Sequence, residues 1–443
     1  MLYNVKFSGT VEITEANAPV PVDPGDNNPT PIPPTSGIKV GVNSFPWFPL
    51  RLLQSIGMPF HRCYLSSGWI WQPGGLAVQP MHQAETAETH GIDEMLTRAK
   101  SMGIETLLCI HQTPEWFRNT GRQDGNNDLA PVKAGANRAD PASYADYARF
   151  LFQVAARYGA VAHSDSILKV DTTPRWSGDV LNEKKTGLSL LKYMEPWNEP
   201  DKWWKKGTAE KDAYFEPEEA AALLSACYDG HEGKLGEHAG IKVADPAMCV
   251  VMPGITDFDV EYMQRMGAWF TANRKDKSWP CDVINVHHYS NLGNKAGQLP
   301  AQWVASGACL PKGDKGFGML QGVIGIAKKH ALPVWVTEFG ADKKAPSMMH
   351  AKAAPGLTDE QFQAEIIIAS IKAYEEAGVD ACFIFNAPDE NSGADGGQFE
   401  TCGIFTSEAS GYKPTMAATA LAGYFKQKTA LAGLFKASAS KRR

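Results

Sequence analysis

The sequence predicts an α/β fold, a (β/α)8 TIM barrel, on three observations. Eight short apolar runs rich in β-branched residues recur along the chain, and a helical pattern follows most of them. The runs are continuously apolar, as expected when both faces of a strand are buried. Repeated strand–helix units indicate parallel strands joined by right-handed crossovers, and eight units close into a barrel. An open doubly wound sheet is the alternative, but no G-x-G-x-x-G follows the first strand.

The predicted strands and helices alternate in order. The strands are residues 38–42, 59–65, 105–111, 191–197, 249–255, 281–289, 333–337 and 380–385. The helices are residues 92–102, 142–158, 216–228, 260–273, 320–329, 359–377 and 415–425. The helix at 142–158 has clear end signals, because Asp140 and Pro141 precede it as N-cap and first residue, and Gly159 follows it.

Four segments are expected along the chain. Residues 1–15 form a short β-like N-terminal appendage, and residues 16–36 are rich in Pro, Asn and Asp, which is typical of a semi-rigid linker. The barrel takes residues 37–426, and residues 427–443 form a basic C-terminal tail. The tail repeats the sequence TALAG at a ten-residue spacing, which leaves the two copies about 80° apart on a helix. A plain terminal helix is therefore favoured over an amphipathic anchor.

Composition excludes several classes of partner. The formal net charge is −6, so nothing favours binding to nucleic acid or to an anionic membrane. No apolar run approaches the ~20 residues that span a bilayer. The N-terminus lacks the pattern of a secretory signal, which leaves the localisation open. The eight cysteines show no C-x-x-C spacing, which favours buried free thiols over disulfides or a zinc site. No cofactor or metal is expected.

Two of the predicted strands lead to a glutamate. In KYMEPWNEPD (192–201) the strand stops at a proline, and Glu199 follows shortly after it. In PVWVTEFG (333–340) the strand is followed directly by Glu338. Active sites of TIM barrels lie at the carboxyl ends of the strands, so strands four and seven would present these carboxylates across the barrel mouth. Glycosidic bond cleavage needs such a pair: one carboxylic acid protonates the leaving oxygen, and in a retaining enzyme the other, about 5–5.5 Å away, attacks the anomeric carbon.

Other polar and aromatic residues at strand ends are predicted to surround this pair. Arg62 and Tyr289 would keep Glu338 ionised, and Asn198 would bind the sugar 2-hydroxyl. His287 shares a strand face with Tyr289, whereas His288 points the other way. Further substrate-binding candidates are His111, Asn386, Trp69, Trp71, Trp197 and Trp203. The tryptophans are included because an indole ring can stack on the apolar face of a sugar ring while part of it stays in contact with water. The plainer interpretations are a core salt bridge for Arg62, an inner-barrel histidine for His111, and core packing for any one tryptophan.

The motifs WNEP (197–200) and TEFG (337–340) together resemble the clan A glycoside hydrolases. These are retaining (β/α)8 enzymes with the acid/base on strand four after an Asn and the nucleophile on strand seven. VHHY (286–289) looks like the clan's strand-six H-x-Y, and residues 104–340 look most like family 39, the β-xylosidase family, or a relative of it or of family 5. The resemblance implies that Glu199 is the acid/base, Glu338 the nucleophile, and the substrate a β-linked oligo- or polysaccharide.

Strand eight departs from the clan pattern, which often has a Trp at its end. Residues 383–388 read FIFNAP, so Phe385, Asn386 or a loop tryptophan would take that place. One rival function is a non-catalytic carbohydrate-binding barrel of a surface or phage-like assembly, motivated by the appendage and linker. Another is a metal-dependent barrel hydrolase, which would require His287 or His288 beside His111; the absence of H-E-x-x-H argues against it.

Overall fold

The computed structural model describes residues 37–79, 89–118, 128–174, 182–256, 259–289, 316–345, 347, 349–353, 356–390 and 397–440. The predicted appendage and linker, residues 1–36, lie outside the described residues, as does Cys309. The helix α12 continues past the predicted barrel boundary at residue 426, and of residues 431–440 only the backbone is described.

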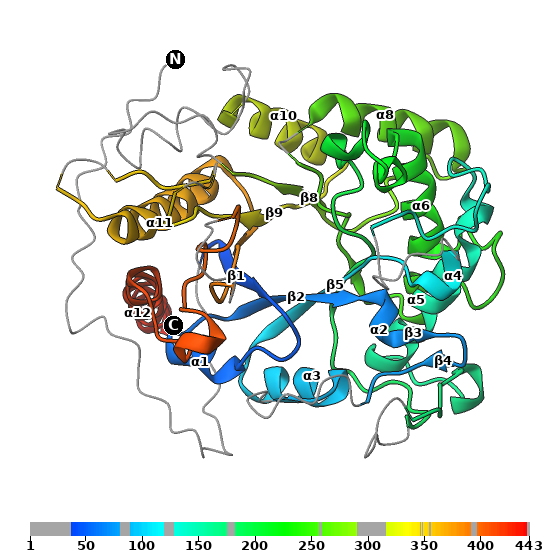
Figure 1. The fold of residues 1–443 in the computed structure, drawn as a ribbon, viewed down its shortest axis with the longest axis horizontal. Helices are drawn as coiled ribbons and strands as arrows, with labels where there is room; N and C mark the ends of the chain where they lie inside the picture. The colour runs from blue at the N-terminus through cyan, green and yellow to red at the C-terminus, as the bar shows by residue number, and fades with distance from the viewer. Residues whose placement is uncertain are drawn as a thin grey trace.

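The barrel strands and the helices alternate along the chain (Figure 1). The barrel strands are β1 (Lys39–Ser44), β2 (Phe60–Ser66), β5 (Glu105–His111), β6 (Tyr193–Glu195), β7 (Cys249–Val250), β8 (Ile284–His287), β9 (Val334–Phe339) and β10 (Ala381–Ile384). The α-helices are α1 (Leu50–Ser55), α2 (Ser67–Ile70), α3 (Ile92–Ser101), α4 (Glu115–Arg118), α5 (Ala145–Tyr158), α6 (Pro217–Asp229), α7 (Ile241–Ala244), α8 (Val260–Asn273), α10 (Gly316–Lys329), α11 (Asp359–Ala377) and α12 (Met416–Ser440). A small antiparallel hairpin, β3 (Trp71–Gln72) and β4 (Gly75–Leu76), follows α2.

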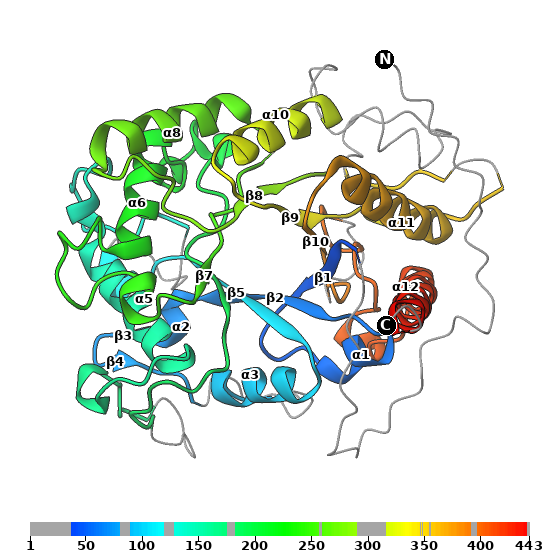
Figure 2. The same cartoon turned by 180° about the vertical axis from the view of Figure 1, so that it is seen from behind.

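The eight strands form one parallel sheet that curls around the centre of the molecule (Figures 1 and 2). Their order is β7-β6-β5-β2-β1-β10-β9-β8, so each strand pairs with its neighbours in the chain order of the barrel. Isolated parallel bridges between Val251 and Val283 and between Ile255 and Val286 join the two outer strands. The predicted (β/α)8 fold is therefore confirmed.

Local chemistry explains where the elements end. The strand β6 is shorter than predicted because Pro196 follows Glu195 and has no N–H to continue the ladder. The helix α11 begins at a capping box of Thr358 and Gln361 and ends at Gly378, whose φ of 89° favours glycine. The helices pack around the outside of the strand ring, with α11 beside α12 and α6 beside α8.

The interior of the barrel has an apolar base and a polar upper layer. Phe60, Trp335 and Phe383 pack on one another in a separate apolar cluster. Two residues further along β2, the guanidinium of Arg62 binds Glu195, and both side chains are completely buried. The apolar layer closes the barrel below this ion pair, so the charged groups face the carboxyl ends of the strands.

Two expectations from the composition concern the cysteines and membrane-spanning segments. All seven cysteines among the described residues are free thiols, and all but Cys249 are buried. Within the described part of the chain, no helix combines the length and the apolar character that crossing a membrane requires.

Candidate active site

Glu338, near the end of β9, lies in a dense set of hydrogen-bond donors. Its Oε1 accepts a hydrogen bond from the Tyr64 hydroxyl and a second, 3.0 Å long, from Nη1 of Arg62. Its Oε2 accepts from the Tyr289 hydroxyl at 2.7 Å. The side chain is only 6% exposed, so each of these contacts acts largely without competition from water.

These contacts keep the Glu338 carboxylate ionised. Burial alone would raise its pKa, but the charges of His287 and Arg62 and the hydrogen bonds from the two tyrosines outweigh burial and hold the pKa below its usual value. Burial raises the pKa of Tyr64 and Tyr289 well above that of an exposed tyrosine, so both hydroxyls stay protonated and donate.

Arg62 connects Glu338 to strand four. Its Nε and Nη2 donate to the two oxygens of Glu195 at 2.7 and 3.0 Å, which is a bidentate ion pair. Nη2 also donates to Oδ1 of Asn198 at 2.8 Å, and Nη1 donates to Oδ1 of Asn43. Glu195 thus forms a buried ion pair inside the barrel. Because Arg62 holds the Asn198 carbonyl, the Asn198 NH₂ group is the one turned toward other partners.

Glu199 sits in a strained turn beyond β6. Its φ is 46°, in the left-handed region that a non-glycine residue rarely adopts. Its N–H donates to the Gly254 carbonyl at 3.1 Å, and the buried ammonium of Lys202 donates to the carbonyls of Asn198 and Glu199 at 2.8 and 3.1 Å. The turn directs the Glu199 carboxyl back toward the barrel axis, where it meets His287.

His287, at the end of β8, lies between the two glutamates. Its Nδ1 is 2.9 Å from Oε1 of Glu199 and 3.3 Å from Oε1 of Glu338. Burial would lower the pKa of the imidazole, but the two carboxylates raise it above its usual value. One oxygen of Glu199, one oxygen of Glu338 and one ring nitrogen of His287 all lie within 4.8 Å of one another. The structure therefore brings the two predicted carboxylates together across the barrel mouth.

The same three side chains carry ligand atoms close enough to share a metal ion. In this arrangement, however, His287 Nδ1 is directed at the carboxylates, and both oxygens of Glu338 accept hydrogen bonds from Tyr64 and Tyr289. The guanidinium of Arg62 already balances the charge of Glu338. These three side chains suit acid–base chemistry better than the binding of a divalent cation. His288 turns away and contacts the Tyr374 hydroxyl at 2.6 Å, in agreement with the predicted alternation.

His111 lies at the end of β5 with its ring edge on Tyr64, at a centroid distance of 5.4 Å. Burial lowers its pKa to about 4, so the imidazole is neutral at ordinary pH. A neutral, half-buried imidazole beside the Glu338 network has one donor and one acceptor nitrogen, which suits sugar hydroxyls.

The predicted tryptophans divide into two groups. Trp203 is 58% exposed in the loop after β6, and half-buried Trp69 continues an aromatic row from Tyr64 through Phe45 and Trp47. The prediction that Trp197 binds substrate is wrong: its indole is 1% exposed and packs on Tyr147 and Phe215.

Trp71, also predicted to bind substrate, does not lie beside the two glutamates. Trp71 is 7% exposed, and its ring stacks on Phe150 of α5 at 5.0 Å and packs on Phe117 at 4.6 Å. The position of Trp197 has a simple cause. Pleat alternation places a side chain only while the strand continues, and β6 ends before Trp197.

Phe385 takes the place expected for a tryptophan at the end of strand eight. Its ring lies against Tyr64, Tyr289 and Phe399 at centroid distances of 6.2, 6.5 and 5.2 Å. Asn386, predicted to bind substrate, is buried, and its Oδ1 accepts a hydrogen bond from the main-chain N–H of Ala387. This hydrogen bond engages the side-chain oxygen with the backbone of its own turn, and substrate binding by Asn386 stays a prediction.

Two contacts of the glutamates were not predicted. Tyr64 binds Glu338 directly, and its spacing of two from Arg62 on one strand was a usable signal. Lys202 reaches the Glu199 turn only because of the left-handed φ at Glu199, for which the sequence carries no signal.

Comparisons with known proteins agree with this architecture. No family model and no curated protein sequence matches the chain. Among solved structures, the chain is similar to a family 39 glycoside hydrolase from the gut symbiont Bacteroides cellulosilyticus WH2, with a TM-score of 0.50 and 13% identity over 87% of this chain and 63% of the other. It is also similar to a GH5_18 protein from Streptomyces cattleya in complex with Manβ1-4GlcNAc, with a TM-score of 0.51 and 15% identity over 88% of this chain and 80% of the other.

At these identities the likeness is one of fold. The chain has the fold of clan A glycoside hydrolases, as the two glutamate motifs predicted. It spans less than two thirds of the length of the first solved structures that it matches.

Proposed function

We propose that this protein is a retaining glycoside hydrolase that cleaves a β-linked oligo- or polysaccharide, with Glu338 as nucleophile and Glu199 as acid/base. The observation that carries the proposal is the separation of the two carboxyl groups, whose nearest oxygens lie within 4.8 Å. Retaining enzymes hold their carboxyl groups about 5–5.5 Å apart, whereas inverting enzymes leave about 6.5–9.5 Å for a water molecule.

The surroundings of Glu338 suit the first step. The ionised carboxylate attacks the anomeric carbon while Glu199, protonated, gives its proton to the departing glycosidic oxygen. The bond from carbon to that oxygen breaks, and a glycosyl ester forms on Glu338. Arg62, Tyr64 and Tyr289 favour the ionised nucleophile and fix its orientation before the attack.

The second step uses the same groups in reverse. Glu199, now ionised, takes a proton from a water molecule, whose oxygen attacks the anomeric carbon and displaces Glu338. His287 contacts both carboxylates and balances their charge as the proton moves between states. Two inversions at one carbon retain the β configuration.

The groups around the pair support a carbohydrate substrate. The Asn198 amide is held by Arg62 and precedes the acid/base, where a sugar 2-hydroxyl would lie in the transition state. Trp203 and Trp204, 58% and 42% exposed, meet edge to face in the loop after β6 and offer indole surface to sugar rings beyond the cleaved bond. The β linkage rests on the clan resemblance and on the β-linked disaccharide held by the Streptomyces cattleya structure.

The test exchanges Glu338 for Gln and Glu199 for Ala and measures turnover of an activated aryl β-glycoside that the wild-type protein cleaves. Each exchange should lower kcat by a factor of at least about 10³. Added azide should restore turnover in Glu199→Ala and give the β-glycosyl azide, because the small anion replaces the water of the second step. Glu390→Gln, an exposed carboxyl after strand eight, is the control.

Wild-type turnover in either variant would overturn the assignment. The rival, a carbohydrate-binding barrel without activity, predicts sugar binding with no turnover in the wild-type protein, so the same assay distinguishes the two functions.

A further inference from the structure

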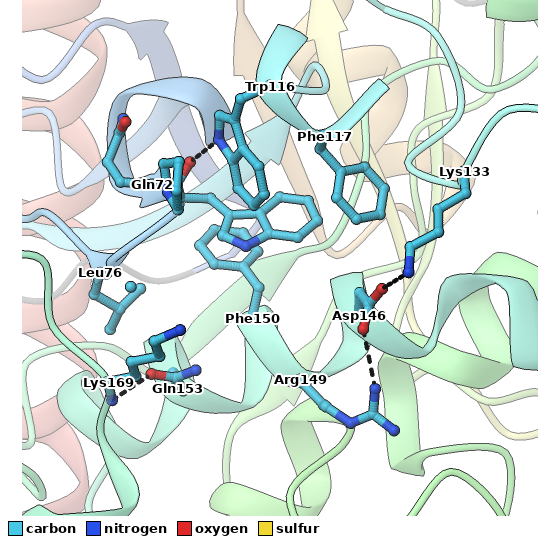
Figure 3. A pocket seen from close by; sticks show the side chains of 13 residues that line it. Gln72, Leu76, Trp116, Phe117, Lys133, Asp146, Arg149, Phe150, Gln153 and Lys169 are labelled. Carbon is cyan, nitrogen blue, oxygen red and sulfur yellow. Dashed lines mark hydrogen bonds and ion pairs between the residues drawn. The ribbon is translucent and has the colours of Figure 1, made fainter. Parts of the chain in front are cut away.

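A cavity of about 460 Å³ lies outside the strand ring, between the β3–β4 hairpin, α4 and α5 (Figure 3). Its volume is within the range of small-ligand sites, about 300–1,000 Å³. None of the side chains that line it contacts Glu199 or Glu338. Figure 1 places β3, β4, α4 and α5 together at one side of the molecule, away from the barrel centre. The cavity is therefore separate from the candidate active site.

The walls of this cavity are held in place by hydrogen bonds. The indole Nε1 of Trp116 donates to the Trp71 carbonyl at 2.8 Å. On the other side, the Leu76 N–H donates to the Lys169 carbonyl at 2.7 Å, and the Lys169 N–H donates to Gln153 of α5 at 2.8 Å. Gly75 has a φ of 125°, and a Cβ there would come 2.1 Å from the Lys169 carbonyl oxygen. The cavity is thus built before any ligand arrives, which lowers the entropic cost of binding.

The lining combines aromatic surface with excess positive charge. Trp116 is 42% exposed, and its ring meets Trp71 edge to face. Lys133, Arg149 and Lys169 contribute three cations, whereas Asp146 is the single acidic residue of the lining. Asp146 contacts Lys133 at 3.4 Å and Arg149 at 3.1 Å, which leaves the Lys169 ammonium as the cation without an acidic partner in the lining. This excess is notable in a chain whose net charge is −6.

We propose that this cavity is a second carbohydrate-binding site, which holds a carboxylated sugar unit of a polysaccharide outside the catalytic centre. The exposed indole of Trp116 takes the apolar face of the sugar ring. The Lys169 ammonium meets the carboxylate. The amide NH₂ of Gln153 and the amide oxygen of Gln72 face the sugar hydroxyls, since the other atom of each amide already binds the main chain. The choice of carbohydrate as ligand class rests on the proposed function, and the preference for an acidic unit rests on the charges of the lining.

The experiment measures polymer binding rather than turnover. Native gels containing carboxymethylcellulose or hydroxyethylcellulose compare an acidic and a neutral β-glucan on one backbone. The parent protein carries Glu338→Gln, so that neither polymer is cleaved during the run. We expect carboxymethylcellulose to retard the parent more strongly. Trp116→Ala should weaken binding of this polymer by about fivefold, the value of one aromatic contact. Lys169→Ala should weaken binding of carboxymethylcellulose and leave that of hydroxyethylcellulose unchanged.

Trp269→Ala is the control, since Trp269 is a half-buried indole of α8 that lies outside both this cavity and the candidate active site. Circular dichroism and melting temperature confirm that each variant is folded. The proposal is overturned if carboxymethylcellulose does not retard the parent, if Trp116→Ala binds it like the parent, or if Trp269→Ala loses as much binding as Trp116→Ala. Because turnover of the aryl glycoside is measured separately, failure of this site and failure of the proposed function are distinguishable.

Discussion

The buried ammonium of Lys202 holds the turn that carries Glu199: its Nζ donates to the Glu199 carbonyl at 3.1 Å and lies 4.0 Å from Oε2 of the same residue. Lys202 is only 6% exposed, and a second hydrogen bond, to the Asn198 carbonyl, fixes the start of the turn. A left-handed φ at a non-glycine residue costs about 1–3 kcal/mol, and the surrounding contacts must supply it. Lys202 therefore positions the proposed acid/base without touching the reacting bond.

We expect Lys202→Met to lower kcat on an aryl glycoside by about tenfold to a hundredfold, because the Glu199 carboxyl would leave its aligned position. KM should change little, since the exchange removes no contact with the sugar. Lys202→Arg should recover part of the activity. The control is Lys205→Met, since Lys205 lies in the same loop but pairs with Glu210. Loss of activity in the control equal to that in Lys202→Met would contradict a specific role for Lys202.

Tyr289→Phe tests how Glu338 is kept ionised. The variant removes the 2.7 Å hydrogen bond to Oε2, so the pKa of Glu338 should rise from its lowered value toward the ordinary range. Activity needs the ionised nucleophile, and it is lost when the pH falls through this pKa. The acid limb of kcat/KM should therefore move to higher pH by about one unit.

The control for this exchange is Tyr193→Phe, because the Tyr193 hydroxyl binds Lys39 at the opposite end of the barrel. Its pH profile should match that of the wild-type protein. An unshifted acid limb in Tyr289→Phe would show that Arg62, His287 and Tyr64 are enough to keep Glu338 ionised.

His287 should make stability depend on pH. Burial alone would lower its pKa, but Glu338 and Glu199 raise it above the unfolded value of about 6.5. The charged imidazole therefore contributes stability that is fully present below about pH 6.5 and is lost as the pH rises through the folded-state pKa.

The measurement is the free energy of unfolding in urea for the wild-type protein and His287→Asn at several pH values. The difference should be largest at about pH 5.5 and shrink as the medium becomes alkaline. His330→Gln is the control: partial burial lowers the pKa of His330, so its contribution cannot have this sign. A difference that grows with pH would contradict the charged state of His287.

Much of this site could be predicted from the sequence, because the barrel rule ties a residue's position along a strand to its position in space. That rule placed Glu338, His287 and Tyr289 at one mouth, and opposite charge paired Arg62 with a carboxylate. The rule does not predict the direction of side chains beyond the end of a strand.

Beyond Pro196 the direction of each side chain depends on the turn, so Trp197 enters the helix layer while Glu199 faces the axis. The reach of Lys202 likewise depends on a backbone angle that only the folded chain defines.

The contrast between Trp197 and Trp203 gives a last prediction. Trp197→Ala removes a side chain that is 1% exposed and packed on Tyr147 and Phe215, so unfolding should become easier by about 3–5 kcal/mol. Trp203→Ala removes a side chain that is 58% exposed, so stability should change by less than about 0.5 kcal/mol. Trp203→Ala should instead raise KM severalfold for a long oligosaccharide and leave KM for a short aryl glycoside unchanged, because only the longer chain reaches the loop after β6. Urea denaturation and steady-state kinetics on both substrates measure the two effects. If Trp203→Ala bound the long substrate as well as the wild-type protein did, sugar stacking on this loop would be ruled out.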